Sequence, residues 1–121
     1  MARIVHFEFA ANNPERAAKF YHDVFGWEST HWGGPADYWL VKTGSGEPGI
    51  DGGILQYTDK MPRTINTIGV DSVDDYLKKV TANGGTITKP KMAIPGVGYQ
   101  AYCIDTEGNV FGIHETDPSA K

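Results

Sequence analysis

The sequence predicts an α+β fold of two modules, each made of one strand, one helix and three further strands. Two kinds of segment support this: short runs in which apolar and polar residues alternate, and two longer runs with helical spacing. The pattern also occurs twice. A shift of 59 residues pairs the two helix starts, Asn13 with Ser72, and the two helix ends, Gly26 with Gly85. We therefore expect an internal duplication within one domain of residues 1–121.

The first module is expected to span about residues 1–59. Residues 4–10 alternate and predict a strand with His6 and Glu8 on one face. Asn13 suits the N-cap of the helix that follows, and Gly26 suits its C-terminal stop. Three more strands are expected at residues 27–32, 38–43 and 53–58, with a glycine-rich loop over residues 44–53.

The second module is expected over about residues 60–116. A strand is predicted at residues 64–70, and Ser72 can cap the next helix with Asp75 three residues further on. That helix should stop at the Asn-Gly-Gly sequence of residues 83–85.

The last structured segment, residues 102–115, has the pattern of a β-hairpin. Turn-forming residues at positions 105–109 separate two apolar runs. In its second strand Gly112 and His114 should share one face, while Glu115 should point to the other. The residues after position 116 are small and polar, and we expect them to fray.

Composition limits the choice of partner and compartment. A chain of 121 residues can bury about two-thirds of the surface that its unfolded form exposes, so it needs no cross-link to fold. The single cysteine, Cys103, excludes an internal disulfide, and a buried thiol in a cytoplasmic protein is expected. We find no signal peptide and no segment of membrane-spanning length. The net charge of −4 without basic clusters argues against a nucleic-acid partner and favours small molecules or proteins.

Polar residues on the first and last strands are the best candidates for chemistry. His6 and Glu8 share a face, whereas His114 and Glu115 are adjacent and must face opposite ways, so at most three of the four can converge. Two histidines and a carboxylate could bind a divalent metal. The alternative is that these side chains make ordinary hydrogen bonds. The three tryptophans could stack on a ligand, although packing is their commoner role.

Several motifs together resemble one known superfamily. They are Phe20-Tyr21 on the first helix, followed by VFGWE, then VDSVDD and NGGT at the start and end of the second helix, and DTEGNVFGI in the final hairpin. In this order they resemble the vicinal oxygen chelate superfamily, which contains glyoxalases, bleomycin-resistance proteins and extradiol dioxygenases. The resemblance implies two βαβββ modules whose strands form a curled mixed sheet, a cup that holds the ligand. It also implies a homodimer.

The resemblance further implies positions for metal ligands. The first ligand position of the superfamily's metal enzymes falls at His6, and its equivalent in the second module falls at Ile65, which cannot bind a metal. The glutamate position of the last strand falls at Gly112, and its counterpart lies near Gln56. Because only His6 is a strong ligand, no metal cofactor is predicted. The alternative is a displaced site for Zn, Ni, Mn or Fe built from His6, Glu8 and His114.

We therefore predict a glyoxalase-like protein that binds a small organic molecule in its cup. It would be a lyase or isomerase acting next to a carbonyl group, with His6 or Glu8 as the catalytic base. Contacts with the ligand are expected from Trp39, Gln56, Tyr102 and His114. One alternative is a non-catalytic protein that binds a drug or toxin. Others are a metal-dependent lyase or dioxygenase with the displaced site, and a structural module that binds a protein partner.

Overall fold

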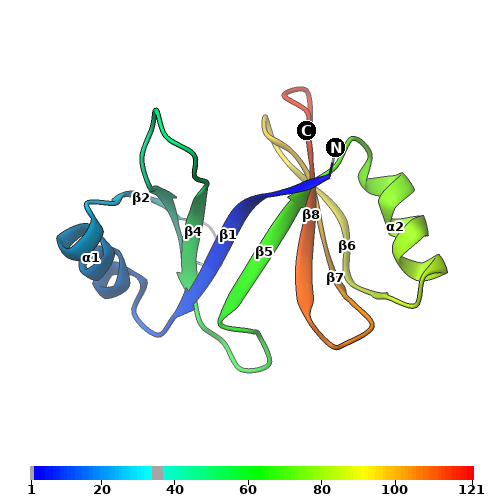
Figure 1. Ribbon diagram of the computed structural model, residues 1–121, viewed down its shortest axis with the longest axis horizontal. Helices are drawn as coiled ribbons and strands as arrows, with labels where there is room; N and C mark the ends of the chain where they lie inside the picture. Colours follow the sequence, from blue (N-terminus) through cyan, green and yellow to red (C-terminus); the bar gives the residue numbers. More distant parts are fainter. Residues whose placement is uncertain (1, 34–36) are drawn as a thin grey trace. The chain divides into compact units, whose positions relative to one another are not determined.

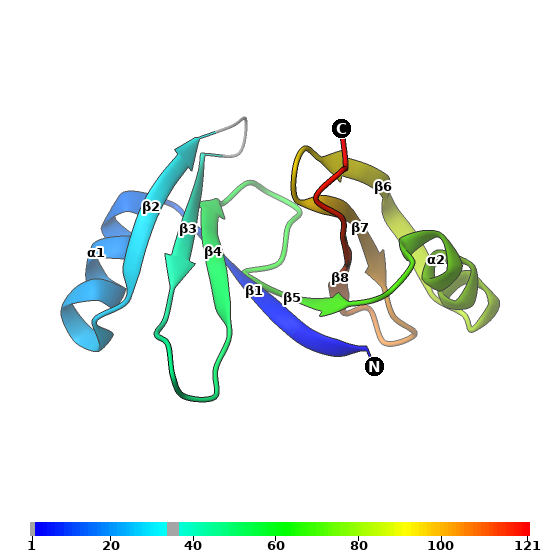
Figure 2. The ribbon, with the colours of Figure 1, turned by 90° about the horizontal axis from the view of Figure 1, so that it is seen from above.

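The computed structural model describes residues 2–33 and 37–121, and the chain forms two compact units. The N-terminal unit is His6–Ile65, and the C-terminal unit is Asn66–Lys121 together with the residues up to Val5. Each unit contains a four-stranded part of the sheet and one helix (Figures 1 and 2). The predicted α+β class and the order of elements in each half are confirmed.

The N-terminal unit contains the elements of the predicted first module, with small differences at their ends. They are β1 (Arg3–Ala11), of which the part from His6 on belongs to this unit, α1 (Pro14–Phe25), β2 (Glu28–Gly33), β3 (Tyr38–Lys42) and β4 (Asp51–Gln56). The strand order is β2-β3-β4-β1. β4 is antiparallel to β3 and parallel to β1. A parallel neighbour of this kind needs a crossover connection, and α1 lies within it.

Helix α1 begins and ends where the sequence predicts, and it covers one face of the sheet. The Asn13 side chain accepts a hydrogen bond from the backbone N–H of Arg16, and Gly26 takes the left-handed conformation at the C-terminus, with φ of 77°. The core of the unit lies beneath the helix and consists of Phe7, Ala18, Val41 and Ile54. Since side chains alternate along a strand, the residues on either side of Phe7 point away from α1.

The expected glycine-rich loop is shorter than predicted, because its last residues belong to β4. We expected this strand at residues 53–58, but it begins at Asp51. Gly52 and Gly53 are buried strand residues. A Cβ atom on Gly52 would lie 2.6 Å from the Phe7 ring, and one on Gly53 would overlap the Tyr38 hydroxyl. Glycine is needed there because neighbouring side chains occupy the space, a role that is easily mistaken for a loop signal.

The C-terminal unit repeats the order of elements. It contains β5 (Thr64–Gly69) from Asn66 on, α2 (Val73–Ala82), β6 (Thr86–Ile94), β7 (Gly98–Ile104) and β8 (Val110–Thr116), with the strand order β5-β8-β7-β6. β8 is parallel to β5 and antiparallel to β7. Its core under α2 consists of Val73, Ala101 and Ile113. The outer strand β6 contains Pro90, and its pairing with β7 shifts register between Lys89 and Met92.

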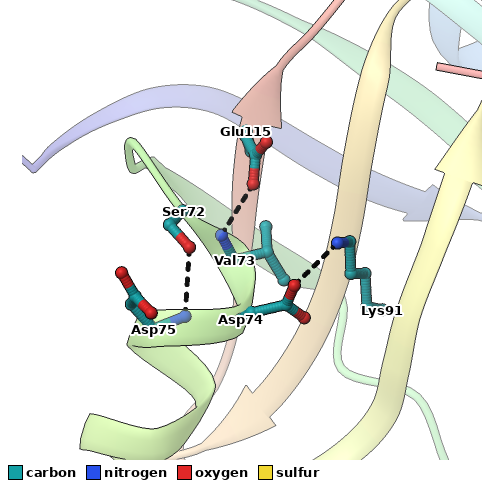
Figure 3. A network of polar contacts seen from close by, with 6 residues as sticks. All are labelled: Ser72, Val73, Asp74, Asp75, Lys91 and Glu115. Atoms are coloured by element: carbon teal, nitrogen blue, oxygen red, sulfur yellow. Dashed lines mark hydrogen bonds and ion pairs between the residues drawn. The ribbon is translucent and has the colours of Figure 1, made fainter.

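A polar network fixes the start of α2 (Figure 3). Ser72 is the N-cap, as predicted, and its Oγ accepts a hydrogen bond from the backbone N–H of Asp75 at 3.2 Å. Glu115 Oε1 accepts from the backbone N–H of Val73 at 2.9 Å. Glu115 therefore points toward α2, which agrees with the prediction that it faces away from His114.

The predicted final hairpin is confirmed, but the tail differs from the expectation. Asp105 and Asn109 close the turn between β7 and β8 through a backbone hydrogen bond. Beyond β8 the chain turns back on its own unit: Ala120 is only 4% exposed, and its carbonyl accepts from the N–H of Gly96 at 2.9 Å. Burial of a small apolar side chain holds this end in place. Within the described residues, neither helix is long and apolar enough to cross a membrane.

Candidate functional site

His6 and Glu8 lie on the face of the N-terminal sheet that points away from α1. Their register partners on β4 are Asp51 and Gly53. Glu8 is 6% exposed, and His6 is half-buried. The structure thus places the two predicted catalytic residues on one face of β1, as alternation along the strand requires.

Tyr38 extends this pair and was not anticipated from the sequence. Its hydroxyl lies 2.8 Å from Nε2 of His6. Tyr38 belongs to β3, and β4 lies between β3 and β1, so the phenol ring must cross β4 to reach His6. It crosses at Gly53, where a Cβ atom would overlap the hydroxyl. A glycine inside a strand often marks such a close approach. Gly53 was therefore the feature of the sequence that indicated this contact.

The surroundings of His6 favour the neutral form of its ring. Burial lowers the pKa of His6 below its ordinary value of 6.5, and the nearby Glu8 and Asp51 carboxylates oppose this effect without cancelling it. A neutral imidazole can accept a proton at pH 7. The carboxylates would then stabilise the imidazolium cation that forms.

Apolar side chains flank this polar group. Trp32 on β2 packs edge-on against the Tyr38 ring, with 6.2 Å between ring centroids, and it is 59% exposed. Leu40 on β3 is also exposed and is the register partner of Gly53, so it lies on the same face. The face therefore combines a proton acceptor with an apolar surface, the combination that small-molecule sites use.

Trp39 and Gln56 lie on the other face, toward α1. Trp39 packs against the core cluster around Ile54, and the Gln56 side chain donates to the carbonyl of Asn12 at 3.0 Å. Both line an open hollow of about 390 Å³ beside the start of α1, together with Asn12, Asn13, Pro14, Glu15, His31 and Asp37. The Trp39 indole N–H is buried and has no hydrogen-bond partner among the described residues. These two predicted ligand contacts thus do not share a face with His6.

A second polar cluster lies in the C-terminal unit, on the face that points away from α2. His114 Nδ1 is 3.0 Å from Oε1 of Gln100, and Nε2 of Gln100 is 3.4 Å from Oγ1 of Thr67. Thr67 and Gln100 are both buried. Tyr102 lies on the same face, because its register partner on β8 is Gly112. Of this cluster, the sequence pointed to Tyr102 and His114 but not to Thr67 or Gln100.

Gly112 repeats the arrangement of Gly53. A Cβ atom on Gly112 would lie 2.6 Å from both Gln100 Nε2 and Thr67 Oγ1. The two glycines are 59 residues apart, the shift that relates the two halves of the sequence. In each unit a polar side chain from the neighbouring antiparallel strand crosses a glycine, Tyr38 in one and Gln100 in the other.

This arrangement does not fit a metal centre of the kind that the resemblance implies. The glutamate position at Gly112 has no side chain, and the Gln100 amide fills the space that a glutamate would need. Across residues 2–33 and 37–121, no three histidine, cysteine, aspartate or glutamate side chains are grouped so as to hold a metal ion. A divalent site normally needs about three protein ligands. We therefore assign no metal-dependent step to these residues.

Two other polar groups have structural roles. Cys103 is fully buried, and burial raises the pKa of its thiol, so it is unsuited to act as a nucleophile. Glu115 binds the first backbone N–H of α2. Neither residue belongs to the clusters around His6 and His114.

Comparisons with known proteins agree on the fold. The family model described as Glyoxalase/Bleomycin resistance protein/Dioxygenase superfamily matches residues 3–113. A glyoxylase-like domain-containing protein from Didymella fabae is 32% identical over 112 residues, which cover 88% of each chain.

Solved structures give the same picture at lower identity. Methylmalonyl-CoA epimerase from Mycobacterium tuberculosis has a TM-score of 0.75 and 13% identity, covering 95% of this chain and 88% of that one. A glyoxalase/bleomycin resistance protein/dioxygenase superfamily member from Vibrio splendidus 12B01 has a TM-score of 0.67 and 14% identity, covering 97% and 100%. At these identities the likeness concerns the fold alone.

Proposed function

Because the chain belongs to the glyoxalase/bleomycin resistance protein/dioxygenase superfamily, we propose that it binds a small organic carbonyl compound and moves a proton at the adjacent carbon, as a lyase or isomerase. The observation that carries this proposal is the state of His6. Its ring is half-buried, burial lowers its pKa below the ordinary value of 6.5, and it lies on one face with the buried Glu8 carboxylate. A base for neutral pH needs a pKa near or below that pH, and a buried imidazole meets this need.

The proposed reaction starts with loss of a proton. The C–H bond next to the carbonyl breaks, its electrons enter an enolate, and a nitrogen of His6 takes the proton. Glu8 and Asp51 stabilise the resulting imidazolium cation, since each carboxylate raises the pKa of His6. Delivery of a proton to the opposite face of that carbon, or to a different carbon, gives an isomer, and expulsion of a group from the next carbon, which takes the electron pair of its bond, gives a lyase product.

Similar solved structures support this class of reaction without assigning it. Methylmalonyl-CoA epimerase, whose substrate is named as a CoA derivative, shares the fold. An epimerase inverts one stereocentre. In an acyl-CoA thioester, a stereocentre next to the carbonyl can be inverted by removing its proton and adding a proton to the other face. The apolar surface of Trp32 and Leu40 favours a substrate that carries an apolar group beside its carbonyl.

Proton exchange in D₂O tests the proposal directly. The protein is incubated with 2-oxo acids, hydroxyketones and acyl thioesters, and ¹H NMR follows the signal of the proton next to each carbonyl. We expect exchange with at least one class, and a loss of roughly 10²- to 10⁴-fold in His6→Gln. The matched control is His22→Gln, an exposed histidine on α1 that should keep full exchange. Equal rates for both variants would contradict the proposal.

The exposed Trp32 favours a second candidate, a protein that binds a drug or toxin without reaction. An aromatic side chain that is 59% exposed can stack on a flat ligand. In this case ligands quench tryptophan fluorescence, Trp32→Ala weakens binding, and His6→Gln changes nothing. Binding without any proton exchange would support this candidate over the enzyme.

The remaining expectations concern assembly and location. We propose a homodimer, as the resemblance implies, and a cytoplasmic protein. Sedimentation equilibrium tests the first, because the mass of a dimer is twice the chain's 13.2 kDa. The His114 and Tyr102 cluster is proposed as a further ligand contact, tested by His114→Ala in the same fluorescence titration.

A further inference from the structure

We propose that Tyr38 is a positioning residue for His6: it binds Nε2 of the ring and leaves Nδ1 as the nitrogen that takes the substrate proton. The geometric part of this inference stands on the structure of the N-terminal unit. Its catalytic part rests on the proposed function. The two parts have separate tests.

The path of the Tyr38 side chain is built into the sheet. Tyr38 starts on β3 and crosses β4 at Gly53, and its hydroxyl lies 2.8 Å from His6 Nε2 on β1. The crossing needs a residue without a side chain, since a Cβ on Gly53 would overlap the hydroxyl. Trp32 packs edge-on against the phenol ring and restricts its movement. A side chain held in this way can fix the orientation of its partner.

The pair allows two tautomers, and the proposed function requires one of them. A phenol hydroxyl both donates and accepts, whereas a neutral imidazole has one N–H and one lone pair. If Nε2 carries the hydrogen, it donates to Tyr38, and Nδ1 keeps the lone pair of a base. Within the part of the chain that the structure describes, the ring makes no hydrogen bond through Nδ1. The opposite tautomer would leave His6 without a basic nitrogen for the substrate.

This tautomer also needs no rearrangement during the reaction. When Nδ1 takes a proton, the Nε2–H group still donates to Tyr38, and it does so more strongly because the ring is charged. Three groups in this unit thus act on the imidazolium: Glu8 from its own strand, Asp51 from β4 and Tyr38 from β3. The first two act by charge and the third by a directed hydrogen bond.

Two substitutions test the arrangement by different routes. Tyr38→Phe removes the hydroxyl and keeps the ring, while Gly53→Ala keeps the hydroxyl and blocks its path. Tyr57→Phe is the matched control, because Tyr57 lies in the same unit and its ring packs on Arg63. Long-range ¹H–¹⁵N NMR of the protein reports the tautomer and titration of His6 without any substrate.

We expect the Nε2–H tautomer in the parent protein and in Tyr57→Phe. In Tyr38→Phe and Gly53→Ala the titration of His6 should move to lower pH, because the imidazolium loses an acceptor. In the exchange reaction kcat should fall roughly 10- to 100-fold with a smaller change in KM, and the acidic limb of the pH profile should move in the same direction. A role in packing alone would not move this limb.

The outcomes separate the two levels of the inference. An Nδ1–H tautomer in the parent protein, or a His6 titration unchanged by both Tyr38→Phe and Gly53→Ala, overturns the positioning role. If the NMR changes occur but no carbonyl compound exchanges its proton, the positioning role stands and the proposed function fails. A matching shift in the NMR titration and in the pH profile supports both.

Discussion

Glu115 on β8 accepts a hydrogen bond from the backbone N–H of Val73, the first residue of α2, at 2.9 Å (Figure 3). The first N–H groups of a helix have no partner within the helix, and a negative charge near them is favourable. The bond is partly buried, so water cannot fully replace it. The last strand thereby completes the start of the second helix.

Removing this carboxylate should weaken the fold. We expect Glu115→Ala to lower the free energy of unfolding by about 1–2 kcal/mol, because a partly buried amide loses its acceptor. Glu115→Gln keeps an acceptor oxygen without the charge and should lose about half as much. Urea unfolding measures both. Glu107→Ala on the exposed β7–β8 turn is the control and should stay within about 0.5 kcal/mol. Equal losses for the Ala and Gln variants would show that the oxygen is not the important group.

Gly112 should not tolerate a side chain. Its Cβ would lie 2.6 Å from Gln100 Nε2 and Thr67 Oγ1, so Gly112→Ala should cost about 1–3 kcal/mol of stability through overpacking. The control is Gly49→Ala, whose Cβ would meet nothing within 4 Å. Adding Gln100→Ala to Gly112→Ala should restore part of the loss, since it removes one of the two clashing atoms. A Gly112→Ala variant as stable as the control would contradict this account.

His6 should make stability depend on pH. Burial lowers its pKa below 6.5, so below that pH the unfolded chain takes up a proton that the folded chain resists. The unfolded state then binds more protons, and stability falls as the pH drops from 6.5 toward the native pKa of His6. Above this window His6 contributes nothing. Urea unfolding at several pH values should therefore show that the free energy of unfolding falls more steeply with decreasing pH in the parent protein than in His6→Gln. A shallower fall in the parent protein would mean that folding raises the pKa of His6.

Metal titration addresses the alternative of a displaced lyase or dioxygenase site. Calorimetry with Zn²⁺, Ni²⁺, Mn²⁺ and Fe²⁺ should show no binding at one ion per chain, because the Gln100 amide fills the position at which a glutamate would serve. Protein purified without chelator should give the same answer by metal analysis. One tightly bound ion per chain that is lost in His6→Ala would restore the alternative, with Glu8 and His114 as the other ligands.

The fold was largely predictable because its signals are local. Asn13 and Ser72 occupy the caps that the sequence indicated, and α1 ends at the expected Gly26. Alternation placed His6 and Glu8 on one face and turned Glu115 away from His114. Caps and alternation depend only on neighbours in the sequence, so they do not require knowledge of which strands pair.

The partners of the candidate residues were not predictable in the same way. Tyr38 and Gln100 reach their partners across an intervening strand, so the strand order and the register must both be known. One signal was present in the sequence: Gly53 and Gly112 stand 59 residues apart, within segments expected to be strands. Two glycines at that spacing indicate two positions where a side chain from an adjacent strand occupies the space of a Cβ atom. Which side chain occupies each of these spaces depends on the three-dimensional structure.

Pro90 has a consequence for how copies of this chain could aggregate. Among the strands of residues 2–33 and 37–121, β2 and β6 are the outer ones, and each has backbone groups that pair with no further strand. Pro90 removes one donor from β6, and Lys89 and Lys91 flank it with positive charge. This combination discourages the addition of another strand. β2 has no proline and carries the exposed Trp32. Intermolecular strand addition, where it occurs, should therefore start at β2.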